Sequence, residues 1–151
     1  MRLLWEAADF LKRVRRQLRF GELSRAPLRL LRLEVKGEVA ECEWIARPPD
    51  PWDADLPLRT GRQHASLQAL KDCLAVRSLL FSAMPEVSRA VFRVYRQAES
   101  EQAELIITGT VTREDVPALN VCSLAMRAQL CGLRFWLADG VLGRFQSEEY
   151  S

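Results

Sequence analysis

The sequence offers few side chains that could carry out catalysis. Its only histidine, His64, could activate a thiol, and Cys73 follows it on the same predicted helix. On an α-helix, the positions of these two residues differ by a rotation of about 180° around the helix axis. Their side chains are therefore expected to point in opposite directions. We therefore expect His64 to be an exposed histidine rather than a general base.

The cysteines do not have the spacing of a metal site or of a disulfide framework. They are far apart and include no CxxC pair: Cys42, Cys73, Cys122 and Cys131. Zinc sites usually need close pairs of ligands, and small secreted domains carry cysteines at higher density. The spacing therefore predicts reduced thiols in a core and no metal.

Other chemical motifs give no stronger signal. Asp50, Asp53 and Asp55 could hold a hard cation, but the prolines among them limit how closely the carboxylates can converge. The sequence has no GxSxG, HExxH, phosphate-binding glycine loop or dinucleotide fingerprint. We therefore expect no cofactor and favour a protein that is not an enzyme.

One arginine lies where an apolar residue is expected. Arg77 falls within the apolar arc of the central predicted helix, and a buried guanidinium needs a partner because an unpaired buried charge costs several kcal/mol. One interpretation is that its stem packs in the core while its head pairs with an acid at the sheet margin. The candidate acids are Glu41, Glu43 and Glu104. The alternative is a pocket in which Arg77 binds a small carboxylate or phosphate.

The N-terminal segment carries the strongest concentration of positive charge. Residues 1–36 contain ten Lys or Arg and four acids, a net +6, whereas the remaining 115 residues contain twelve and sixteen, a net −4. Apolar residues recur at helical spacing through residues 3–20, so residues 1–20 are predicted to form a basic amphipathic helix. Its polar side carries Arg15 and Arg19, with Trp5 among the cations. This side is either a solvated surface or a contact for nucleic acid or an anionic membrane.

A proline-rich strap is predicted at residues 47–58. Four prolines stiffen it around Trp52. We expect this tryptophan to anchor the strap in the body of the protein, with recognition of a partner as the alternative. Of the other tryptophans, Trp44 and Trp136 are expected to be buried in strands, and Trp5 to be the most exposed.

The elements that must position these residues follow from periodicity. A helix is predicted over residues 62–83, opened by a capping box at Thr60 and Gln63 and stopped by Pro85. Its apolar arc is wide, so it should pack on more than one side. A third helix is predicted over residues 117–131.

Alternating residues predict three hairpins around these helices. The strands fall near residues 28–36 and 39–45, 87–96 and 104–112, and 133–137 and 141–145. An irregularity is expected near Leu31, and Leu105, Ile107 and Val111 are expected to share one face of the sheet. The order αββαββαββ favours an α+β fold, with two layers, a largely antiparallel sheet and three helices mainly on one face.

Length and composition suit a single domain over residues 1–151, with a frayed tail at residues 146–151. Acidic residues interrupt any signal-peptide core, and no run of 18 apolar residues exists, so a cytoplasmic protein is expected.

Three functions are compatible with these features. The favoured one is a non-catalytic intracellular module that binds a protein partner or itself. The first alternative is binding of nucleic acid or an anionic membrane through residues 2–20. The third is a small-anion binding protein, or an enzyme, with a pocket at Arg77.

Overall fold

The structure is a computed structural model that describes residues 2–97, 102–114 and 123–145. The described helices are α1 (Arg2–Gln17), a 3-10 turn η1 (Pro51–Asp55), α2 (Leu58–Ala83) and α3 (Leu124–Leu130). The strands are β1 (Arg29–Lys36), β2 (Val39–Ile45), β3 (Arg89–Gln97), β4 (Ala103–Thr112), β5 (Leu133–Arg134), β6 (Trp136–Ala138) and β7 (Val141–Gly143). The predicted tail and the first part of the predicted third helix lie outside the described residues.

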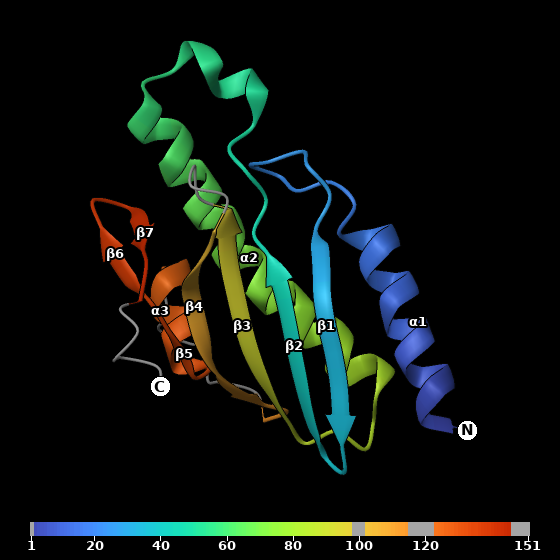
Figure 1. The fold of residues 1–151 in the computed structure, drawn as a ribbon. Helices are drawn as coiled ribbons and strands as arrows, with labels where there is room; N and C mark the ends of the chain where they lie inside the picture. Colours follow the sequence, from blue (N-terminus) through green and yellow to red (C-terminus); the bar gives the residue numbers. More distant parts are fainter. Residues whose placement is uncertain (1, 98–101, 115–122, 146–151) are drawn as a thin grey trace.

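The fold is α+β, with a mostly antiparallel five-stranded sheet in the order β1-β2-β3-β4-β5. Figure 1 shows α2 passing behind this sheet and α1 towards its β1 edge, where α1 contacts α2. β2 and β3, however, are neighbours and run parallel. The reason is that α2 carries the chain back along the sheet between them, and a parallel pair requires such a crossover.

The C-terminal strands also differ from the predicted third hairpin. β5 is short and pairs with β4, whereas β6 and β7 form a separate two-stranded sheet. Their turn is the predicted Asp139-Gly140, with φ of 58° and 78°, the positive values that a two-residue hairpin turn requires. Trp136 opens β6 and is 57% exposed, so the prediction that it is buried is wrong. It lies on this small hairpin and not in the main sheet.

The central helix begins earlier than predicted. α2 starts at Leu58 after Pro57, so Thr60 lies inside the first turn and the predicted capping box does not form. Proline is favoured beside a helix start because its φ is preset and its missing N–H is not needed there. The helix ends at Ala83, before Pro85, as predicted.

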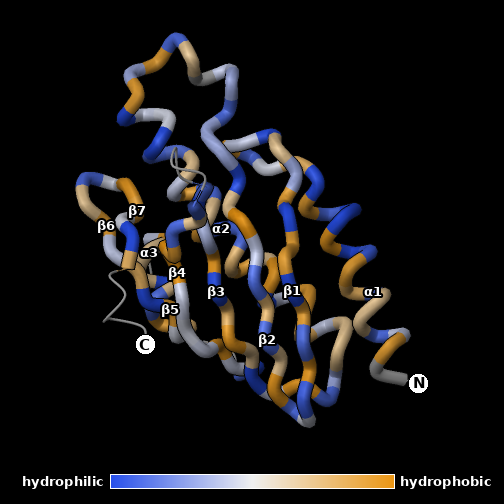
Figure 2. The backbone as a smooth tube through the Cα atoms, in the orientation of Figure 1, coloured by the Kyte–Doolittle hydropathy of each residue, from blue (hydrophilic) through white to orange (hydrophobic). Residues whose placement is uncertain are grey.

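The core is formed by one face of the sheet together with the apolar sides of α1 and α2. Along β2 the buried residues alternate with partly exposed ones, and Figure 2 shows this alternation of apolar and polar residues in β2 and β3. Trp44 is fully buried, as predicted, and its ring packs edge-on against that of Phe92, with 5.1 Å between the ring centres. Phe10 and Val14 of α1 are buried in the same cluster.

Two irregularities adjust the strands. The register of β1 shifts between Leu30 and Arg32, which confirms the irregularity predicted near Leu31. A second shift in the β3–β4 pair places Leu105 opposite Tyr95. The prediction that Leu105 continues the core face is therefore wrong, because the extra residue in β4 reverses the alternation there.

A buried ion pair connects three segments of the chain. The guanidinium of Arg47 donates to both carboxylate oxygens of Asp72, at 2.8 and 3.1 Å, and to the carbonyl oxygen of Ala26 at 2.8 Å. Both charged side chains are at most 2% exposed. Gln68 donates to Asp72 at 3.0 Å and accepts a hydrogen bond from the backbone N–H of Leu23. The network thus ties the end of β2, the middle of α2 and the loop after α1 to one another.

The pair should be required for stability. Replacing Asp72→Asn leaves the Arg47 charge buried without its counter-ion, so we expect the free energy of unfolding to fall by about 3–5 kcal/mol in urea titrations. The double variant Arg47→Met with Asp72→Leu, which removes both charges, should be less destabilised than Asp72→Asn. The matched control is Glu22→Gln. Glu22 is an exposed ion-pair partner of Lys71, which lies beside Asp72 on α2, so this change should leave the urea midpoint unchanged. Equal destabilisation by Asp72→Asn and Glu22→Gln would contradict the assignment.

Candidate functional site

The structure places three of the predicted site residues, Trp5, Arg15 and Arg19, on the exposed side of α1 and of the turn that follows it. We name this surface the α1 outer face and define it by its exposed cationic and large apolar residues: Leu4, Trp5, Lys12, Arg15, Arg16, Arg19 and Phe20. Trp5 is 74% and Leu4 72% exposed, because the opposite side of the helix supplies Phe10 and Val14 to the core. The helix is thus held by its apolar stripe, and its cations face outwards.

The cations of the α1 outer face are not neutralised. Within the described residues, no acid pairs with Lys12, Arg15, Arg16 or Arg19, and the guanidinium of Arg19 lies over the ring of Phe20, 5.2 Å from its centre. Arg13 differs, since it pairs with Asp9 at 3.0 Å and donates to Ser82. The α1 outer face therefore carries four free positive charges within eight residues.

A shallow groove borders this face. It has a volume of about 300 Å³ and is lined by Val14, Arg15, Leu18, Arg19, Pro27 and Leu28. Four of its six lining residues are apolar, and the other two are the arginines. Arg15 and Arg19, which were predicted as binding residues, thus flank one groove.

Trp52 does not anchor the strap. It is 75% exposed, so the prediction that it tucks into the body of the protein is wrong. The strap is instead ordered by Asp50, whose carboxylate accepts from the backbone N–H groups of Arg25 and Trp52 at 3.1 and 3.0 Å. The guanidinium of Arg25 lies over the Trp52 ring at 5.0 Å. Trp52 is therefore accessible on a loop held in place by its neighbours.

Arg77 reaches the margin of the sheet, but its partners are not the predicted acids. It donates to the carbonyl oxygens of Thr112 and Glu114 at 2.8–3.1 Å. Arg113 approaches from the other side and donates to carbonyl oxygens at the end of α2, those of Phe81 and Met84, at 2.7 Å. Both guanidinium groups lie over the ring of Phe81. The pair thus joins the C-terminal end of α2 to the end of β4.

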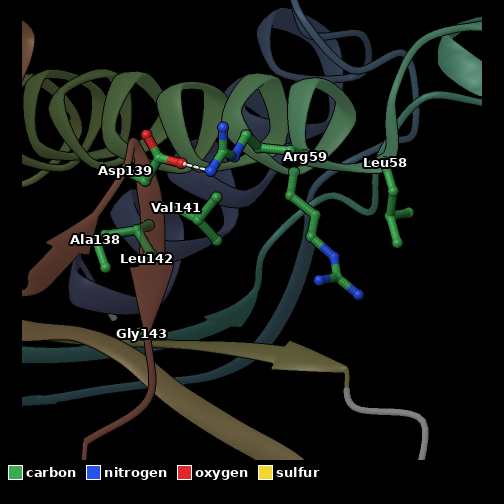
Figure 3. Close-up of a pocket in the computed structure, with 8 residues that line it drawn as sticks. Leu58, Arg59, Ala138, Asp139, Val141, Leu142 and Gly143 are labelled. Carbon is green, nitrogen blue, oxygen red and sulfur yellow. Dashed lines mark ion pairs between the residues drawn. The ribbon is translucent and has the colours of Figure 1, made fainter.

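A second groove lies between the start of α2 and the small hairpin (Figure 3). Its volume is about 370 Å³, and its lining is Leu58, Arg59, Arg62, Ala138, Asp139, Val141, Leu142 and Gly143. An ion pair between Arg59 and Asp139 closes one side. The lining is mainly apolar, and none of it was predicted as a site.

Two of the three described thiols lie where unreactive cysteines are expected. Cys42, Cys73 and Cys131 are free, and the first two are fully buried. Burial, with a smaller contribution from Glu43, raises the pKa of Cys42 to about 12. Burial also raises the pKa of Cys73 well above its usual value, helped by the charge of Asp72. Burial raises the pKa of Asp72 itself, although the hydrogen bonds and charge of Arg47 act in the opposite sense.

Metal and membrane-spanning features are not found in the described part of the chain. The His, Cys, Asp and Glu residues searched there form no group of three or more that could hold a metal ion. None of the helices described has the length and apolar character needed to cross a membrane. Comparison with protein-family models, curated proteins and solved structures finds no match.

The sequence gives no indication that several residues make important buried contacts. Arg47, Asp72 and Arg113 look like ordinary polar residues until the fold brings their partners to them. The exposed apolar hairpin could have been suspected, because Trp136, Leu137 and Ala138 form an apolar run on a short segment near the end of the chain.

The roles of the two arginines beside Phe81 can be separated by substitution. We expect Arg113→Met to lower the free energy of unfolding by roughly 2–3 kcal/mol, because partly buried carbonyl groups at the helix end lose a charged donor. Arg77→Met should cost roughly 1 kcal/mol, since the carbonyl groups it contacts can bind water instead. Urea titration of both variants measures this. A phosphate- or carboxylate-induced rise in melting temperature that Arg77→Met abolishes would instead support the anion pocket.

The thiols should differ in reactivity. With iodoacetamide at mildly alkaline pH, we expect the peptide carrying Cys131 to be alkylated in the folded protein, and those carrying Cys42 and Cys73 only after unfolding. Peptide-resolved mass spectrometry measures the three rates. Alkylation of Cys73 as fast as Cys131 would contradict the assigned burial.

Proposed function

We propose that this protein is a non-catalytic binding module that engages another protein through the surface around its small C-terminal hairpin. We name this surface the hairpin surface and define it by Leu58, Trp136, Leu137, Ala138 and Val141. The observation that carries the proposal is that all three residues of β6 are apolar and exposed. Trp136 and Ala138 lie on one face of the hairpin and Leu137 on the other, because successive side chains of a strand alternate. Exposed apolar side chains concentrated on one short hairpin are typical of protein contact sites.

The unpaired edge of the hairpin supports this proposal. β6 pairs only with β7, so its other edge is free of strand partners within the described residues. A free, apolar edge strand favours addition of a strand from another chain. Trp136 is 57% exposed there, and tryptophan is among the residues most enriched at the energetic centres of interfaces.

The hairpin is also held in one position, which favours binding. Gln63 donates to the carbonyl oxygen of Asp139 at 2.7 Å, and the backbone N–H of Leu142 donates to Ser66 Oγ at 2.9 Å. Arg96 donates to the carbonyl oxygen of Leu142. A surface fixed before binding loses less conformational entropy when a partner is bound. Leu58, 69% exposed beside the groove, extends the apolar area onto α2.

The test is crosslinking from the surface itself. A photo-crosslinking amino acid at Leu137 should form a discrete adduct with a protein, either a second copy or a different chain. The same amino acid at the exposed Ser78 of α2 should not form this adduct. Light scattering across a concentration series separates the two kinds of partner.

Trp136→Ser should abolish the adduct from position 137, whereas Trp5→Ser, the same change at a comparably exposed site, should leave it intact. A chain that stays monomeric at every concentration and gives no adduct at 137 beyond that at 78 would overturn the proposal. An adduct that Trp136→Ser leaves unchanged would do the same.

A further inference from the structure

We infer that the α1 outer face is a peripheral docking surface for an anionic lipid bilayer. This inference is independent of the hairpin surface, because the two share no residue. It rests on the charge, the exposed apolar side chains and the groove found on and beside α1.

The charge of the α1 outer face matches a negatively charged surface. Lys12, Arg15, Arg16 and Arg19 are exposed and lack acidic partners among the described residues. At 100° per residue, the first three fall within an arc of about 100° on one side of the helix. Each cation held near an anionic bilayer increases the binding constant by a factor of about five.

The apolar residues among these cations favour lipid over nucleic acid. Leu4 and Trp5 lie at the start of the helix and Phe20 just beyond its end, and they are 72%, 74% and 65% exposed. An aliphatic side chain such as Leu4 gains little from phosphates or base edges, but it gains from the acyl boundary of a bilayer. Tryptophan is favoured at the level of lipid headgroups, where its apolar ring and its N–H both find suitable surroundings.

The groove beside α1 fits one lipid headgroup region. Arg15 and Arg19 flank it, and its remaining lining is Val14, Leu18, Pro27 and Leu28. A phosphate can meet the guanidinium groups while the adjoining methylenes contact Leu18, Pro27 and Leu28. The groove therefore offers a charged and an apolar contact side by side, as an anionic phospholipid requires.

The packing of α1 sets the mode of binding. Phe10 and Val14 are 0% and 2% exposed in the core, so the apolar stripe is not available for insertion. The helix would lie on the bilayer by its outer face while staying packed on the protein. Attraction between charges should then dominate, and binding should weaken steeply as salt rises.

The experiment is flotation of the full chain with vesicles. Vesicles of equal parts phosphatidylglycerol and phosphatidylcholine should carry the protein at about 50 mM salt and release it at about 500 mM, where charges are screened within a few Å. Pure phosphatidylcholine vesicles should not carry it. A labelled duplex DNA is titrated in parallel as the competing anionic partner.

Matched variants locate the surface. Arg15→Gln with Arg19→Gln should weaken vesicle binding about 25-fold, a factor of about five for each lost cation. Arg89→Gln with Arg134→Gln, which removes the same charge from exposed positions on the sheet, should leave binding unchanged. Trp5→Ser should weaken binding to vesicles and not to DNA. Circular dichroism checks that each variant is folded.

Three results would overturn the inference. The first is absence of binding to the anionic vesicles at low salt. The second is equal weakening by the α1 and sheet double variants, which would indicate a response to net charge alone. The third is tighter binding to DNA than to vesicles with no effect of Trp5→Ser, which would assign the surface to nucleic acid.

Discussion

The buried pair of Arg47 and Asp72 is the interaction on which the arrangement of the chain depends. Two charges withdrawn from water are tolerated because each nitrogen of the guanidinium and each oxygen of the carboxylate has a hydrogen-bond partner: the carboxylate receives two bonds from Arg47 and one from Gln68, and the guanidinium also donates to Ala26. Such a pair gives little net stability compared with apolar packing, but it penalises any arrangement in which one partner is absent. It therefore selects one position of the loop after α1 relative to α2 and β2.

That constraint determines which surfaces are presented. The loop after α1 must lie close to α2, and a Cβ at Gly21 would be only 2.6 Å from the side chain of Gln68. With the loop held there, α1 packs along α2 by its apolar stripe, and its cations face away from the core. The strap that follows Arg47 is positioned from the same point, which leaves Trp52 exposed while Ser24 donates to the carbonyl oxygen of Pro48. The buried Arg47–Asp72 network thus determines which charged and aromatic side chains are exposed on the surface.

Sequence patterns predicted the features that depend on local chemistry. Pro85 stops α2, Asp139-Gly140 makes the hairpin turn, and the irregularity at Leu31 is present. Features that depend on distant partners were missed or misjudged. Arg77 was recognised as unusual, yet its acceptors are backbone carbonyl groups, which leave no trace in side-chain identity. Trp136 was assigned to a buried strand because a strand of the right pattern was expected in the main sheet, whereas it lies on a separate hairpin.

The parallel neighbours β2 and β3 affect how the chain acquires its structure. The two hairpins on either side of them connect residues close in sequence, as in the pair of Lys36 with Val39. The seam between the hairpins instead pairs Val39 with Arg89, fifty residues later, across the whole of α2. Closing so long a loop loses more chain entropy before any contact compensates for it, so distant pairings tend to form late. Each hairpin can form early with its own turn, and we expect the joining of the two hairpins to set the folding rate of the sheet.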